Sequence, residues 1–206
     1  MNKSFQKNEV QSPEEQPSET LTDITPLSAL NSGYFIQIIQ AQLSGKIVLP
    51  HALGLSEIEY QDLKAAINDS ELNQKEAEWN QDKSEYLRQR AEFCAEMFAM
   101  KSEEHEELKV LLNSYCSEQA PFSDKMAVIV ATASLTKFHL WESLGLVERT
   151  QLSDLIRYNF PELYALNTKN MRWKRFFYHQ LCEQEGSYLC KAPSCEECKS
   201  YSECFA

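Results

Sequence analysis

Apolar residues recur at helical spacing along most of this chain. From Leu27 to Leu43, and again from Tyr86 to Tyr115, they step by three or four residues, or by multiples of a turn, which predicts helices with one apolar face. We expect the second of these stripes to be continuous through Phe93, Met100 and Leu111. Gly45 is a plausible end for the first helix, since glycine commonly follows the last helical residue.

Two shorter signals add helices to this pattern. Ser56 and Glu59 have the spacing of a capping box, which predicts a helix that runs on through Ile67. Residues 125–135 are apolar on nearly every side, so we place that helix at the centre of the core, with Asp124 as a candidate cap.

The remaining helices are punctuated by glycine and proline. Gly145 is a candidate helix end, and a helix over 148–158 stops before Pro161, because a residue that precedes proline is disfavoured in helical geometry. The last helix is expected from about Pro161 to Glu185, in two parts joined near Asn167. Since no long alternating run is present, the sequence predicts an all-α fold, an irregular helical bundle with a C-terminal cysteine-rich metal-binding loop.

The chain divides into three regions by composition. Residues 1–27 are polar and acidic and are expected to form a disordered arm. A helical domain follows over 28–186, in which the polar stretch 69–85 is either a solvated helix or a flexible insertion, and a cysteine-rich tail occupies 187–206. The start lacks the apolar core of a secretory signal, and no apolar run is long enough to span a bilayer. We therefore expect a cytoplasmic protein without a membrane partner.

Charge and glycine content exclude several function classes. The net charge is −11, from 20 basic and 31 acidic residues, so the chain as a whole repels nucleic-acid backbones and no nucleic-acid partner is expected. Only 5 of 206 residues are glycine, and none lie close enough together to form the glycine-rich loops that hold dinucleotides or phosphates.

Five of the seven cysteines fall within the last 25 residues. Four of them form the spacing C-x4-C-x2-C-x5-C, at Cys190, Cys195, Cys198 and Cys204. A C-x4-C-x2-C order occurs in plant-type ferredoxins and favours an iron–sulfur cluster, whereas a set of four cysteines also suits structural zinc. A reduced, metal-free tail is the third interpretation.

Just before this tail lies a concentration of basic residues in an otherwise acidic chain. At helical spacing Arg172, Arg175, His179 and Cys182 fall within one quadrant, beside an aromatic face that includes Trp173. The basic side chains Arg172, Lys174 and Arg175 either balance the charge of an anionic cluster or attract an oxyanion; an ordinary solvated face is the alternative.

These residues, taken in order, resemble the NifQ family of nitrogen-fixation proteins. The similarity covers about 70 residues. It is carried by the segments His139–Leu146, Leu152–Leu163, Met171–Tyr178 and Gln180–Gly186, and then by the four-cysteine tail.

The resemblance implies a molybdenum-handling role in building the iron–molybdenum cofactor of nitrogenase. It implies a cluster of molybdenum, iron and sulfur held by Cys190, Cys195, Cys198 and Cys204. The implied partners are a molybdate or other molybdenum source, the cofactor-assembly scaffold and the nitrogenase iron protein. On this view the chain is a metal donor or carrier and not a turnover enzyme. A zinc-stapled interaction module and an electron-transfer carrier are the rival hypotheses.

Several other residues have either a functional or a purely structural role. Cys182 is either an additional ligand or a packing cysteine, and His139 and His179 are candidate non-thiol ligands with structural hydrogen bonding as the alternative. Cys94 and Cys116 are expected in the core. The glutamates at 103, 104, 106 and 107 are expected only to solvate a polar helix face.

Overall fold

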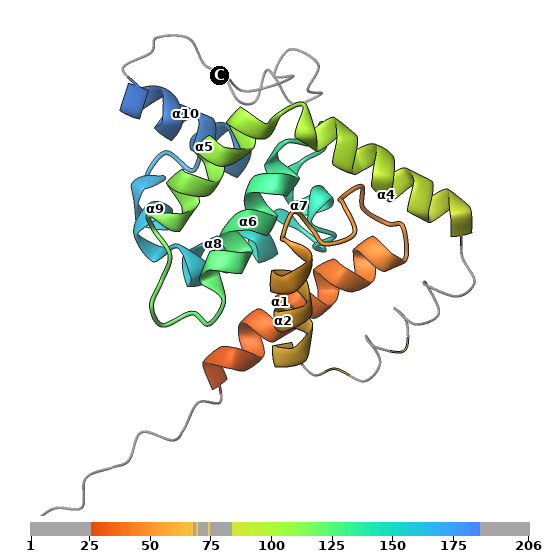
Figure 1. Cartoon of the computed structure of the whole chain (residues 1–206). Coiled ribbons are helices and arrows are strands. Elements are labelled where there is room, and N and C mark those ends of the chain that lie inside the picture. The colour runs from red at the N-terminus through yellow and green to blue at the C-terminus, as the bar shows by residue number, and fades with distance from the viewer. Residues whose placement is uncertain (1–25, 68, 70–73, 75–83, 186–206) are drawn as a thin grey trace, which may run out of the picture.

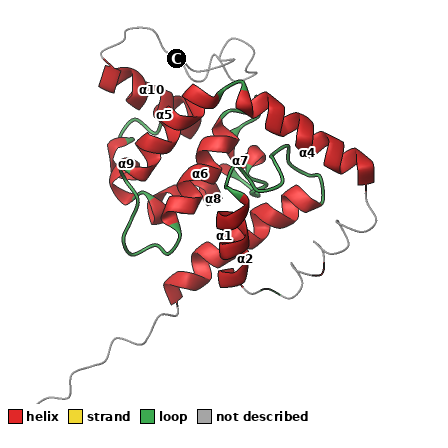
Figure 2. Cartoon of the chain, in the orientation of Figure 1, coloured by secondary structure: helices red, strands yellow, loops and turns green. Residues whose placement is uncertain are grey.

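The computed structural model describes residues 26–67, 69, 74 and 84–185, and these form helices joined by short loops, with no strand among them (Figures 1 and 2). The all-α prediction is confirmed for this part of the chain. The helices, in order, are α1 (Pro26–Leu43), α2 (Glu57–Ile67), α4 (Ser84–Ala99), α5 (Ser102–Asn113), α6 (Ser123–Ser134), α7 (Leu140–Ser143), α8 (Arg149–Asn159), α9 (Pro161–Leu166) and α10 (Trp173–Glu185).

Several predicted regions lie outside the described residues. They are the arm at 1–27 up to residue 25, most of the polar stretch 69–85, and the cysteine-rich tail at 187–206. Within the described helices, none combines the length and the apolar character that crossing a membrane requires.

Helix α6 occupies the centre of the core, as its sequence predicts. It is buried on nearly every side, and α5 packs along it with α7 at its far end. Figure 1 shows α6 enclosed among α1, α5, α7 and α8. Its small residues include Ala127, Ala131 and Ala133, all fully buried, which let the neighbouring helices approach closely.

The predicted continuous stripe over 86–115 is wrong in its first half. The chain breaks at Met100 and Lys101 into α4 and α5; α5 buries its stripe at Leu108, Leu111 and Leu112, whereas the stripe residues of the first half whose burial is described are exposed. Phe93 and Met100 are 62% and 82% exposed. Helical periodicity was correct, but α4 runs out to the edge of the body in Figure 1, and among the described residues α5 is its main neighbour.

Helix ends follow the predicted local signals. The Ser56 backbone N–H donates to the Glu59 carboxylate at 2.9 Å, and the Glu59 N–H donates to the Ser56 hydroxyl at 3.3 Å, which is the reciprocal pattern of a capping box. The last helical segment is divided into α9 and α10, as predicted, around the link that begins at Asn167. Asp124 is not the cap of α6; Phe122 precedes that helix and Asp124 lies in its first turn.

A pair of buried amides fastens α1 to α8. Asn31 and Asn159 are 1% and 0% exposed and exchange two hydrogen bonds, with N···O distances of 2.7 and 2.9 Å. Their remaining amide hydrogens reach the carbonyls of Pro121 and Leu155. Because buried amide groups are costly unless paired, this arrangement fixes the register of the two helices.

Gly145 ends α7 with φ of +67°, where side chains are rarely tolerated. A Cβ here would lie 2.4 Å from the Cβ of Ala41, so α1 packs directly on this backbone. Gly33, on α1, has nothing within 4 Å of an added Cβ.

We predict opposite effects for alanine at these two glycines. Gly145→Ala should lower the free energy of unfolding by about 2–4 kcal/mol, because left-handed geometry and overpacking both penalise it. Gly33→Ala should raise it by about 0.5–1 kcal/mol through helix propensity. Urea denaturation followed by circular dichroism measures both, and equal effects would contradict the close approach of α1.

Candidate functional site

The short link before α10 sets the direction of this helix, which leads into the cysteine tail. The Arg149 guanidinium donates to the backbone oxygen and side-chain oxygen of Asn170, each at 3.0 Å, and to the Met171 carbonyl at 3.4 Å. Asn170 has φ of +48°, a geometry that asparagine tolerates better than most residues. The Asn167 side chain both accepts from the Met171 N–H and donates to its carbonyl. The direction in which α10 leaves α9 is therefore fixed by hydrogen bonds.

The aromatic face of α10 is buried, as the sequence predicts. Trp173 is 5% exposed, stacks on Tyr164 with ring centroids 5.6 Å apart, and donates its indole N–H to the Ser153 hydroxyl at 2.9 Å. Phe177 and Tyr178 are fully buried further along the helix. The helix is thus held to the body along its length.

Two of the predicted basic side chains join the start of α10 to the loop between α6 and α7. Arg172 Nη1 lies 3.4 Å from His139 Nδ1. Lys174 Nζ donates to the carbonyl oxygens of Thr136 and Phe138, the latter at 3.2 Å. Arg172, Lys174 and Arg175 are all partly buried, so the face is not a simple solvated surface.

The contact with Arg172 constrains what His139 can do. A guanidinium is only a donor, so Nδ1 accepts and the proton of the neutral imidazole resides on Nε2. The backbone N–H of His139 also donates to the Glu142 carboxylate at 3.0 Å, at the start of α7. Metal binding through Nε2 would require a different tautomer and displacement of Arg172, which favours the structural role for this histidine.

The other candidate ligands on α10 do not converge with His139. Cys182 is buried, at 7% exposure, whereas His179 is exposed and its Nδ1 lies 3.4 Å from the Glu183 carboxylate. Among the described residues there is no group of three or more histidine, cysteine or acidic side chains placed to hold a metal. The predicted ligands Cys190, Cys195, Cys198 and Cys204 lie outside those residues.

The two cysteines expected in the core are placed against it. Cys94 is 4% exposed, and Cys116 is partly buried against the main cluster. Burial raises the pKa of the Cys116 thiol, which keeps it protonated and unreactive at neutral pH.

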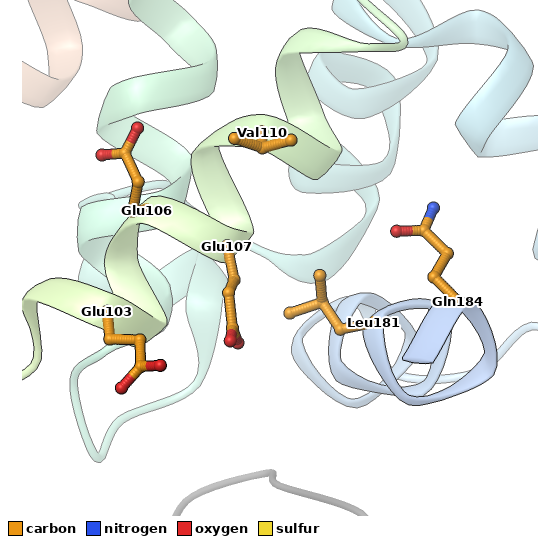
Figure 3. A pocket seen from close by; sticks show the side chains of 6 residues that line it. All are labelled: Glu103, Glu106, Glu107, Val110, Leu181 and Gln184. Carbon is orange, nitrogen blue, oxygen red and sulfur yellow. The ribbon is translucent and has the colours of Figure 1, made fainter. Parts of the chain in front are cut away.

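The polar face of α5 does more than interact with solvent. Glu104 accepts a hydrogen bond from the buried Tyr178 hydroxyl of α10, and Glu103, Glu106 and Glu107 line an open groove between α5 and α10. Figure 3 shows these glutamates with Val110 on one side and Leu181 and Gln184 on the other. This role was not predicted from the sequence, because contacts 74 residues apart leave no local signal.

His105 on the same helix faces the interior. Its Nε2 lies 2.9 Å from the Thr132 hydroxyl, which itself donates to the Val128 carbonyl at 2.8 Å, so the histidine is the donor. Burial, and secondarily the charge of Lys109, lower the pKa of His105 below 6.5. This contact joins α5 to the central helix α6.

Comparison with known proteins identifies the family of this chain. Residues 34–206, from the middle of α1 through the cysteine tail, match the sequence profile of the NifQ family. The chain belongs to the NifQ family. That family is implicated in nitrogen fixation.

Two relatives match most of the chain. Protein NifQ of Azotobacter vinelandii is 41% identical over 169 residues, which covers 82% of this chain and 85% of that protein. Protein NifQ of Klebsiella pneumoniae is 37% identical over 163 residues, covering 79% and 90%. A NifQ homolog of Sinorhizobium fredii is 47% identical over 98 residues, or 48% of this chain and 43% of the homolog. No solved structure matches this NifQ-family chain.

We predict that Lys174 stabilises the fold through its two carbonyl contacts. Lys174→Met should lower the free energy of unfolding by about 1–3 kcal/mol, because the partly buried Thr136 carbonyl loses a charged donor. Lys169→Met, at an exposed position just before α10, should change it by less than about 0.5 kcal/mol. Urea denaturation compares the two, and equal losses would show that Lys174 only adds surface charge.

His105 should make stability depend on pH. Below pH 6.5 the unfolded histidine binds a proton that burial disfavours in the folded state, so the free energy of unfolding falls as pH drops. His105→Gln should reduce the difference in unfolding free energy between pH 7.5 and pH 5.5. A difference as large as that of the unchanged chain would contradict the buried contact.

Proposed function

We propose that this chain is a molybdenum-handling iron–sulfur protein that donates molybdenum during biosynthesis of the nitrogenase iron–molybdenum cofactor. The observation that carries the proposal is the four-thiol set of the tail, at the end of a chain that belongs to the NifQ family. Molybdenum is cargo in this scheme, and iron and sulfide build the cluster that carries it.

The chemistry of the donor set fits such a cluster. Cys190, Cys195, Cys198 and Cys204 supply four soft thiolates within 15 residues, and soft ligands select iron–sulfur clusters over hard cations. When bound, the cluster would supply a sulfur environment for molybdenum. The cysteine thiols bind metal only after they lose their protons, so metal binding releases protons and depends on pH.

The placement and charge of α10 support the proposal. Trp173 and the link that Arg149 holds fix the start of this helix, and the cysteine tail follows it in the sequence. Cations at the start of α10 offset some of the negative charge that a thiolate cluster carries. Arg172 and Lys174 do this while bonded to the loop at 136–139, and Arg175 is the third cation of the set.

Donation requires partners that receive the metal. We propose the nitrogenase cofactor-assembly scaffold as acceptor, with the nitrogenase iron protein taking part, and molybdate or another molybdenum source as supplier. The chain then passes on bound metal and does not turn over a substrate as an enzyme does. A cytoplasmic location goes with this scheme, because reduced thiolates persist there.

A zinc-stapled interaction module is the rival, because four thiolates are also a structural zinc set. The two proposals differ in colour and composition. A zinc module would be colourless, with one zinc per chain, no sulfide and loss of the tail's fold on chelation.

Elemental analysis of anaerobically purified protein separates these functions. We expect several irons per chain with sulfide and some molybdenum. In Cys195→Ser/Cys198→Ser the bound iron and molybdenum should be lost, while far-ultraviolet circular dichroism keeps its helical signal. Cys116→Ser, outside the four-cysteine set, is the matched control and should load like the unchanged chain.

Two outcomes would overturn the proposal. Metal loading that survives the double substitution would show that the ligand assignment is wrong. Zinc alone, without sulfide after anaerobic iron reconstitution, would replace the donor function with the interaction module.

A further inference from the structure

An open groove runs between α5 and α10, beside the end of the described chain. It has a volume of about 540 Å³ and is lined by Glu103, Glu106, Glu107, Val110, Leu181 and Gln184. Such a volume falls within the roughly 300–1,000 Å³ of sites that hold ligands or side chains. In Figure 3, Glu107 lies opposite Leu181 across the groove.

The lining combines an apolar part with an acidic edge. Val110 is 62% exposed although it lies on the helix that packs against the central helix α6. Leu181, 6% exposed, lines the groove from α10, so most of the accessible apolar surface comes from Val110. Three carboxylates border this surface, of which Glu106 pairs with Lys109 at 2.8 Å. A complementary occupant carries apolar side chains next to a cation.

The chain itself supplies such a segment where it leaves the groove. Gln184 lines the groove and α10 ends one residue later. The next residues include Tyr188, Leu189 and Lys191, and Lys191 is the only charged side chain from 186 to 191. At roughly 3.3–3.6 Å per extended residue, the four residues from Gln184 to Tyr188 reach roughly 13 Å, enough to turn back along the groove.

We propose that residues 187–191 dock into this groove, with Tyr188 and Leu189 against Val110 and Leu181 and with Lys191 beside the acidic edge. The tether makes this docking intramolecular, with an effective concentration on the order of millimolar for a short linker. A free partner peptide of equal intrinsic affinity would have to reach that concentration to compete. The same chain is therefore favoured over a second copy or another protein.

The docking would set where the metal-binding tail begins. Cys190 lies between Leu189 and Lys191, so a docked segment holds the first of the four thiols against α5 and α10 and leaves the other three to close around a metal. This consequence rests on the proposed function; the docking itself does not require metal. Fixing one ligand in advance reduces the entropy lost when the tail closes.

Photo-crosslinking within the full-length chain tests the docking. p-Benzoylphenylalanine is placed at Val110 in the groove, or at Glu103 on its edge, and the crosslinked residues are mapped by fragmentation in a mass spectrometer. Ile58, on α2 and 76% exposed, is the matched control position. We expect crosslinks to residues 187–191 of the same chain, at least five-fold more abundant from position 110 than from position 58.

Two other patterns overturn the docking. Crosslinks between two chains would assign the groove to a second copy, and equal yields from positions 110 and 58 would leave the tail without a preferred position. The measurement is made on metal-free and on iron-loaded protein. Loss of the crosslink with normal metal content contradicts only the docking, whereas an intact crosslink on a chain that binds no iron contradicts only the proposed function.

Discussion

The structure depends on the burial of α6 and on closure of the end of that helix. A helix that is apolar on nearly every side must be surrounded, and its last carbonyl groups still need hydrogen-bond donors. Lys101 donates to the carbonyl of Leu135, the residue that ends α6, at 3.1 Å, and Lys174 donates to the carbonyls of Thr136 and Phe138 in the loop that follows. Cations at this end also suit the helix dipole. Because Lys174 belongs to α10, its contacts with this loop tie the helix that leads to the cysteine tail to the end of the central helix.

Helix α10 therefore connects the core with the cysteine-rich tail. Its aromatic side chains are buried, its first cations bond the loop before α7, and its last turns border the acidic groove of α5. Charge is unevenly placed in a protein with a net charge of −11. Cations gather at the start of α10 and carboxylates lie along α5. An anionic cluster would therefore be attracted to the start of α10, and a basic segment to α5.

Much of the candidate site could be proposed from the sequence because its chemistry is local. Four cysteines within 15 residues predict a metal site from the sequence alone, because the spacing is a local feature. The basic residues before them were equally visible, but their partners were not. That Arg172 meets His139, and that Arg149 holds Asn170, follows from contacts between residues 33 and 21 positions apart. Such contacts carry no local pattern.

The sequence by itself determined the helical class, the burial of α6, the capping box at Ser56 and the turn at Gly145. Each of these depends on a few neighbouring residues, because periodicity, capping and left-handed geometry are local properties. Only the tertiary structure decided that the stripe over 86–115 breaks at Met100, that Asn31 pairs with Asn159, and that α5 and α10 enclose a groove. These features arise when helices distant in sequence compete for the same core, and burial against a partner decides them.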